Sequence, residues 1–414
     1  MLTFPSQRRR PSLWVCLWLA AVCSTLACGR IGYESIDRSG TSSATDGQDN
    51  DTPVNGSGVS TPLETVPGPL FEQVFFTGPA SGDEDLTDFT LFVVREGDEA
   101  MASTARVGGA LGVHLAGNTA ALPVEVQRLD SDTGYAEFWV RVPTLRHDAP
   151  TELVLTLGTL DRASLPAASD VWNDYNDVYH FEEVGQGLVG EYRNSAGGTG
   201  GTGGHGQADR TPQRVPGPLG FGQRFDGGDD FIALAASGGI TGSQGTLSHW
   251  LQPESDNFRV AYYEKAGSGE LDGFGSGSSE TLERHSAVEP TNEAFFLWQE
   301  RPADGIDNQQ RVKSPMLGRQ HVVITWSLTG HMRLYLNGTH IQAHTMADRN
   351  LGEMSADYRV LGRPHTDLAA HHWHGTVDEL RVGRRALPGA FIATEFANQS
   401  SPSTFIVWGP LEQR

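Results

Sequence analysis

Short runs of alternating apolar residues, separated by turn residues, make up most of the sequence from residue 70 to the C-terminus. The run LTDFTLFVVR at 86–95 and the run QHVVITW at 320–326 show the pattern. A two-residue period in polarity is typical of strands that bury one face. The 50 glycines among 414 residues also favour turns over long helices. We therefore expect an all-β protein.

The three cysteines, Cys16, Cys23 and Cys28, all lie near the N-terminus. No cysteine follows them, which excludes a disulfide framework, a cysteine zinc site and a cysteine nucleophile from the rest of the chain. The β-structure must therefore be held together by packing and hydrogen bonds alone.

The N-terminus has the features of a signal peptide. Three arginines at 8–10 precede an apolar run at 13–27, which is shorter than the roughly 20 residues of a spanning helix. The run ends in the sequence TLAC at 25–28, which resembles the bacterial lipobox. That resemblance implies that residues 1–27 are removed and that Cys28 is lipidated and anchors the protein. Ordinary signal-peptidase cleavage nearby is the alternative.

The residues after Cys28 suggest a location and a tether. Gly29 and Arg30 follow, with no aspartate. By resemblance to the sorting rule of enterobacterial lipoproteins, this implies the outer membrane of a Gram-negative bacterium, outside the cytoplasm. Residues 28–69 are rich in Ser, Thr, Gly, Asp and Asn and predict a flexible linker between the lipid anchor and the folded part.

The charge restricts the partners. Thirty basic residues against 51 acidic ones give a formal net charge of −21. Without the signal segment, which holds three arginines and no acid, 27 basic residues remain and the charge is −24. Such a chain does not favour nucleic acid or an anionic bilayer surface, so membrane contact is expected through the lipid anchor only.

The first folded unit is expected at 70–182. Strand patterns stand at 86–95, 122–128, 135–142 and 152–157. A hairpin turn is predicted at 130–134, between the second and third strands. The strand FWVRVP at 138–143 and the stretch VWNDYNDVYHFE at 171–182 resemble a bacterial β-domain of uncharacterised function that precedes laminin-G-like domains. The resemblance implies a small β-sandwich and brings no known activity.

The second unit is expected at 183–414. Five motifs stand there in order, FDGGDDF, GTLSHW, HVVITW, RLYLNG and HGTVDELRV, beginning at 225, 245, 321, 333 and 374. They resemble the laminin-G-like, concanavalin A-type jelly roll, which implies a β-sandwich with Trp250, Trp326 and Trp373 in its core. Hairpin turns are predicted at 327–330 and at Asn337-Gly338.

Three further segments of this unit can be interpreted from their composition or by resemblance. The Gly-rich stretch at 195–206 predicts a mobile loop, and the polar stretch at 264–310 a loop-rich insertion. The end of the chain, at 391–405, resembles the way bacterial copies of this domain pair finish.

Catalysis is not expected. Glycosidases of this fold carry paired acids spaced as E-x-D-x-x-E on one strand, and that pattern is absent here. Asp378 and Glu379 are neighbours, so on a regular strand they face opposite sides. No serine-nucleophile or HExxH motif is present. No catalytic residue is assigned, although acids distant in sequence that meet in the fold keep a glycoside hydrolase open.

Calcium is the candidate cofactor. Asp226, Asp229 and Asp230 lie in a Gly-bearing turn, and carboxylate oxygens suit Ca²⁺. Resemblance to jelly rolls that hold a structural Ca²⁺ adds Asp378 and Glu182 as contributors. The alternative is that these acids cap turns and accept backbone hydrogen bonds.

Glycan binding needs exposed aromatic side chains, and the candidates are Tyr262, Tyr263, Phe274 and Trp298. Packing under loops is the alternative for each. The sequence thus predicts a non-catalytic surface lipoprotein with a lectin-like module for a glycan or for an envelope or extracellular protein. A structural or adhesive envelope protein is the alternative, and a carbohydrate-active enzyme is less favoured.

Overall fold

The computed structural model describes residues 69–414 except 205, 237, 255–258, 267–280, 289–292, 302–307, 316–317, 347–357 and 365–370. For 266, 281–286, 288, 293–301 and 308–315 it describes the backbone only. The predicted signal segment, Cys28 and nearly all of the linker lie outside the described residues. Residues 65–414 belong to one compact unit.

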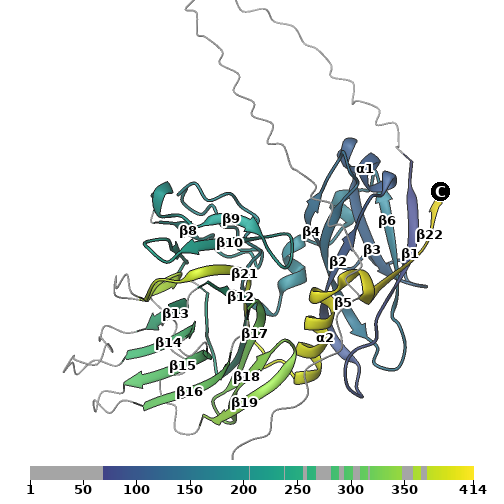
Figure 1. The fold of residues 1–414 in the computed structure, drawn as a ribbon. Coiled ribbons are helices and arrows are strands. Elements are labelled where there is room, and N and C mark those ends of the chain that lie inside the picture. Colours follow the sequence, from purple (N-terminus) through teal and green to yellow (C-terminus); the bar gives the residue numbers. More distant parts are fainter. Residues whose placement is uncertain are drawn as a thin grey trace, which may run out of the picture. The chain divides into compact units, whose positions relative to one another are not determined.

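The first domain is a sandwich of two antiparallel sheets (Figure 1). The order of one sheet is β22-β1-β6-β3, with β22 at Ile406–Gln413, β1 at Phe71–Thr77, β6 at Glu152–Gly158 and β3 at Ala110–Leu115. The order of the other is β2-β5-β4, with β2 at Leu86–Arg95, β5 at Ala136–Leu145 and β4 at Val124–Leu129. The apolar positions of their two-residue pattern form one buried core that includes Phe89, Val140 and Leu155.

One short helix interrupts this domain. Helix α1 spans Glu99–Arg106 and begins after Asp98, whose side chain accepts hydrogen bonds from the backbone N–H groups of Ala100 and Met101. This is the usual N-cap arrangement, which satisfies donors that the helix leaves open. The predicted turn at 130–134 is confirmed, because the N–H of Gly134 donates to the carbonyl of Asp130 at 3.1 Å.

The jelly roll consists of two larger sheets. The first has the order β19-β18-β17-β12-β21-β10-β9, and β7 pairs with β21 beside this path. The strands lie at Thr339–Thr345 (β19), His331–Leu336 (β18), Gln320–Ser327 (β17), Gln244–Pro253 (β12), His374–Gly383 (β21), Phe221–Asp226 (β10), Gln213–Pro216 (β9) and Tyr175–Tyr179 (β7). Short 3-10 helices lie at Arg162–Ser164, Ala168–Trp172 and Ala208–Arg210.

The second jelly-roll sheet corrects the prediction for 264–310. Its order is β16-β15-β14-β13-β20-β11-β8, with strands at Asn308–Pro315 (β16), Glu293–Arg301 (β15), Thr281–Val288 (β14), Arg259–Ala266 (β13), Tyr358–Leu361 (β20), Ile232–Ala233 (β11) and Thr202–Gly203 (β8). Every described residue of the expected insertion therefore belongs to a strand. Its many polar residues hid the two-residue period, because a backbone ladder forms without an apolar side chain at every second position.

Both sheets of the jelly roll contribute to one apolar core, which includes Trp326 and Trp373. Both tryptophans are fully buried, and Trp250 is 5% exposed, so their predicted packing role is confirmed. The all-β class is likewise confirmed. No helix among the described residues is long and apolar enough to cross a membrane.

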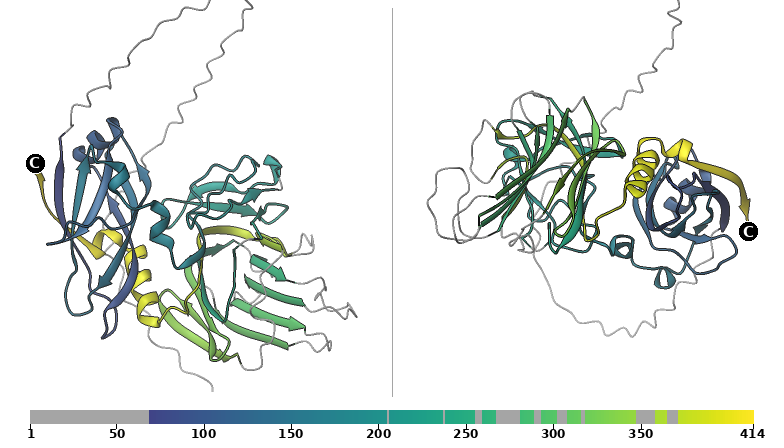
Figure 2. Two further views of the ribbon diagram at one scale, coloured as in Figure 1. Left: turned by 180° about the vertical axis from the view of Figure 1, so that it is seen from behind. Right: turned by 90° about the horizontal axis from the view of Figure 1, so that it is seen from below.

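Each domain contains a segment that the sequence analysis assigned to the other. Strand β7, expected in the first unit, pairs with β21 of the jelly roll. Helix α2 at Gly389–Ser400, helix α3 at Pro402–Phe405 and strand β22, all expected in the jelly roll, join the first domain (Figure 2). Strand β22 pairs with β1, and Phe391 and Ile406 enter the first core. Elements of each predicted unit therefore pair or pack with the other unit.

The Gly-rich stretch at 195–206 is packed against other backbone. A Cβ on Gly200 would lie 2.5 Å from the carbonyl oxygen of Gly190, and Gly201 exchanges backbone hydrogen bonds with Tyr192. Glycines are needed here for close approach. This corrects the prediction of a mobile loop.

Candidate functional site

A cavity of about 180 Å³ opens where β4 of the first domain faces the segment that follows β7. We call it the junction cavity. Its lining includes Glu125, Gln127, His180, Glu182, Glu183 and Arg193, with Val126 and Ser195 completing it.

Two local irregularities of the backbone orient these side chains. The pairing of β4 with β5 shifts its register between Val126 and Arg128, which places Gln127 in a bulge. Phe181 has a φ of +60° and is buried in the jelly-roll core, while its neighbours His180 and Glu182 line the cavity. A positive φ is costly for a residue with a large side chain, so the surrounding packing must hold this turn in place.

Glu125 is 2% exposed and accepts four interactions. Its partners are the indole N–H of Trp172, the hydroxyl of Ser195 at 2.7 Å, His180 at 3.3 Å and the guanidinium of Arg193 at 3.0 Å. Burial alone would raise the pKa of Glu125, but these hydrogen bonds and the charge of His180 lower it below its ordinary value. Glu125 is therefore a carboxylate with its acceptor positions already used.

His180 bridges the two domains. Its Nδ1 lies 2.7 Å from Glu379 of β21, on the side opposite Glu125. Burial opposes the charged imidazolium, yet the two glutamates together raise the pKa of His180 to about 10. Beyond it, Arg381 pairs with Glu379 and Glu395 and lies 4.2 Å from the ring centroid of Trp139.

A second set of acids surrounds the β9–β10 turn at 217–220. We call Glu137, Glu182 and Asp378 the acid group. A Cβ on Gly217 would lie 2.5 Å from Asp378 Oδ2, and one on Gly220 would overlap Glu182. The turn thus requires glycine in order to pass close to both carboxylates.

The acid group is short of partners. Oδ1 of Asp378 and Oε2 of Glu137 are buried and have no hydrogen-bond partner. Burial, assisted by neighbouring carboxylates, raises the pKa of Glu182 to about 7 and that of Asp378 well above its ordinary value. A buried carboxylate oxygen without a partner is stabilised by a proton or a cation.

The five predicted calcium ligands fall into two places. Candidate ligand atoms of Asp226, Asp229 and Asp230 lie within 4.8 Å of one another. Glu182 and Asp378 are not part of this group; they lie at the other end of β10, where Phe221 N–H donates to Glu182 and Gly222 is in contact with Asp378.

The turn with three aspartates already has partners of its own. Asp226 N–H donates to Asp230 at 2.9 Å, and Arg210 pairs with Asp229 at 3.2 Å. Burial and the two neighbouring aspartates raise the pKa of Asp230 to about 6.

The predicted ligand-binding aromatics are not available at the described positions. Tyr262 is fully buried in the jelly-roll core, and Tyr263 is 2% exposed in a smaller apolar cluster. Their expected exposure is therefore wrong, because the polar context that suggested loops belongs to a sheet. Phe274 lies outside the described residues, and Trp298 belongs to β15, where only the backbone is described.

Asp378 and Glu379 serve different neighbours, although both are buried. The pairing of β12 with β21 shifts between Ser248 and Trp250, and Glu379 there has a φ of +53°. Asp378 faces the β9–β10 turn, and Glu379 contacts His180 and Arg381. No catalytic pair is formed by these two acids alone.

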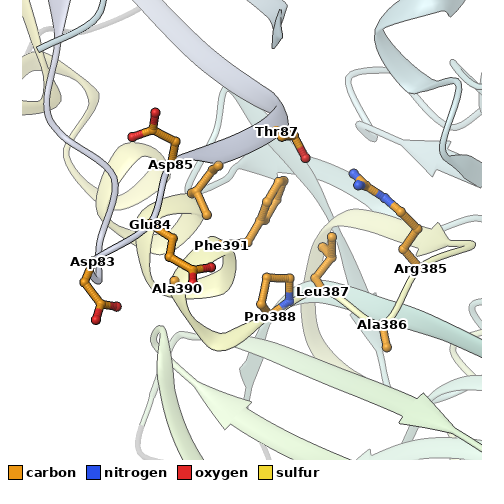
Figure 3. A pocket seen from close by; sticks show the side chains of 11 residues that line it. Asp83, Glu84, Asp85, Thr87, Arg385, Ala386, Leu387, Pro388, Ala390 and Phe391 are labelled. Carbon is orange, nitrogen blue, oxygen red and sulfur yellow. The ribbon is translucent and has the colours of Figure 1, made fainter. Parts of the chain in front are cut away.

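A second cavity, of about 230 Å³, lies between the β1–β2 loop and the segment that leads into α2 (Figure 3). Figure 3 shows Glu84 and Arg385 on opposite sides, with Leu387 and Phe391 between them. Nearby, Asp85 accepts hydrogen bonds from the backbone N–H and Nδ1 of His147.

Sequence reasoning missed Glu125, His180, Arg193 and Ser195. Hydrogen-bonded partners in this cluster are up to 199 positions apart, so no local spacing brings them together. One signal was present: charged residues such as Glu137 interrupt otherwise apolar strands.

The comparisons with known proteins bear on the jelly roll. Residues 226–393 match the family described as the concanavalin A-like lectin/glucanases superfamily. A comparison with curated proteins finds no similar sequence.

Among solved structures, the chain is similar to domain 4 of AbnA, an extracellular arabinanase from Geobacillus stearothermophilus in complex with arabinotriose. The identity is 18%, the TM-score 0.36, and the match covers 54% of this chain and 98% of that one. It is also similar to the botulinum neurotoxin DC binding domain in complex with rat synaptotagmin II (11%, TM-score 0.37) and to the serotype D ligand-binding domain with N-acetylneuraminic acid (12%, TM-score 0.38). Each toxin match covers 55% of this chain and about half of the toxin domain, 52% and 51%. By its family match, the region at 226–393 is a concanavalin A-like domain.

Proposed function

We propose that this protein is a non-catalytic glycan-binding protein of the cell surface. The observation that carries the proposal is the match of 226–393 to a family of lectins and glucanases. Two ion-paired acids support a binding role over hydrolysis. Glu125 is held by His180 and Arg193, and Glu379 by His180 and Arg381, so neither is free to act as an acid or a nucleophile.

The test combines binding with turnover. Purified protein is applied to a glycan array, and in parallel to cell-envelope material for capture of protein partners. We expect saturable binding to a defined set of glycans and no release of reducing sugar from them. Binding to envelope protein alone would contradict the glycan ligand and indicate a protein partner. Release of reducing sugar would contradict the non-catalytic role and indicate an enzyme.

Attachment through lipid on Cys28 is part of the proposal. Its support is the lipobox-like sequence at 25–28 and the polar linker at 28–69. Mass spectrometry of the mature N-terminal peptide should give the mass of an acylated cysteine. The Cys28→Ser variant should leave the outer membrane fraction; an unmodified N-terminal residue in the natural protein contradicts the anchor.

We also propose a structural Ca²⁺, held by Asp378 and Glu182. The support is the unpaired buried Oδ1 of Asp378, because a hard cation would satisfy it and neutralise the acid group. Bound calcium would hold the β9–β10 turn against β21.

Calcium titration by calorimetry, with the melting temperature followed in parallel, tests the site. The Asp378→Asn variant should lose both binding and calcium stabilisation. If Asp226→Asn loses them instead, the ion belongs to the turn at 226–230.

A further inference from the structure

The junction cavity has the size of one ring. Its volume of about 180 Å³ is slightly larger than a cavity of about 150 Å³ that accepts benzene. Ligand sites occur preferentially where domains meet. This condition holds here, since β4 of the first domain and the segment after β7 form the walls.

The chemistry of the lining favours a neutral polar ligand. Several of its groups are already hydrogen-bonded to one another: Glu125 is saturated and His180 uses both ring nitrogens. Glu183 Oε1 accepts the backbone N–H of Arg193 at 2.9 Å. Arg193 uses one nitrogen for Glu125, and its side chain is 61% exposed at the cavity.

A carboxylate and a guanidinium that line one cavity match two adjacent hydroxyl groups. Each hydroxyl donates to the carboxylate and accepts from the guanidinium N–H groups, with charge-assisted strength. Val126, 39% exposed, adds an apolar surface that suits the C–H face of a ring. The carboxylate of Glu183 at the same wall repels an anionic ligand.

We propose that the junction cavity binds one neutral sugar ring through a pair of adjacent hydroxyl groups, with Arg193 and Glu183 as the contacts. This rests on the proposed glycan-binding function and adds its location and its selectivity. It also gives the first domain a role, because β4 supplies one wall of the site.

Saturation-transfer NMR and calorimetry test the proposal, with free glucose, galactose, mannose and arabinose as neutral probes and glucuronic acid and N-acetylneuraminic acid as anionic ones. At least one neutral sugar should bind the natural protein, and neither anionic sugar should. Arg193→Ala and Glu183→Gln should each weaken binding by about tenfold or more, because each removes a charge-assisted hydrogen bond. Val126→Trp should block the cavity while leaving every polar group in place.

Arg146→Ala is the matched control. Arg146 is similarly exposed (52% against 61%) and pairs with Asp148, away from the junction cavity lining. It should bind sugar like the natural protein, and Arg146→Ala, Glu183→Gln and Val126→Trp should keep the melting temperature within a few degrees.

The outcomes separate two failures. If the natural protein binds array glycans but Arg193→Ala and Val126→Trp bind them equally well, the cavity assignment is overturned and the glycan function stands. If the natural protein binds no glycan of any kind, both are overturned. Preference for an anionic sugar also contradicts the assignment.

Discussion

Arg381 lies in β21 with its guanidinium 1% exposed between Glu379 and Glu395. Replacing it by Met leaves two buried carboxylates that have each lost a counter-ion. Breaking a buried pair from one side costs about 3–5 kcal/mol of the free energy of unfolding, a large part of the usual 5–15 kcal/mol. Urea denaturation measures it. Arg224→Met is the control, because its pair with Glu254 is exposed and contributes about 1 kcal/mol or less; equal losses in the two variants would contradict the network.

His180 makes the stability of the protein depend on alkaline pH. Its ordinary pKa is 6.5 and its folded pKa is about 10, so the folded state holds an extra proton between these values. The stability from His180 is therefore complete below pH 6.5 and is lost as the pH rises towards 10, by at most about 1.4 kcal/mol per pH unit. Urea midpoints from about pH 7 to about pH 9 should fall in the natural protein. His180→Gln should flatten this slope, and the half-buried His147→Gln should not.

At the scale of elements, the β18–β19 turn packs closely against helix α2. Asn337 and Gly338 both have positive φ, +49° and +76°, as the predicted type I′ turn requires. A Cβ on Gly338 would lie 3.0 Å from the Cα of Ala393 and 3.1 Å from the Cβ of Phe396, both on α2.

Gly338→Ala should therefore lose more stability than Gly242→Ala. Both glycines have positive φ, but a Cβ on Gly242 meets nothing within 4 Å. Each variant carries about 1–2 kcal/mol of left-handed backbone cost, and overpacking against α2 adds at least about 1 kcal/mol at Gly338. Thermal denaturation measures the difference, and hydrogen exchange in α2 should rise only for Gly338→Ala. Equal losses would mean that α2 shifts freely.

At the scale of the whole molecule, we expect residues 65–414 to unfold in one step. Strand β22 from the end of the chain completes the sheet that contains β1, and β7 completes a jelly-roll sheet. Trp139 and Trp172 of the first unit share an apolar cluster with Leu219 and Trp250 of the jelly roll. Calorimetry should show a single unfolding transition. The Trp172→Ala variant should shift that whole transition to lower temperature. Two separate transitions, with only one displaced, would show independent domains.

The elements with a clear two-residue period were predictable. The strand expected at 86–95 is β2 with the same bounds, the run at 320–326 is β17 within one residue, and the motif that begins at 245 lies in β12. The strands at 264–310 escaped notice because sheet pairing, not an apolar pattern, defines them. The junction cavity was not predictable, because Glu125, His180 and Glu379 carry no shared local spacing.

The sequence by itself determined the all-β class, the absence of disulfides from the body and the motifs of the concanavalin A-like domain. These follow from side-chain period and composition, which act over a few residues. Only the tertiary structure decided that β22 returns to the first domain, that Tyr262 is buried, and that Glu182 and Asp378 lie apart from the turn at 226–230. Each of these depends on which distant segments pair, and the free energy of that pairing comes from burial and hydrogen bonds between residues far apart in the chain.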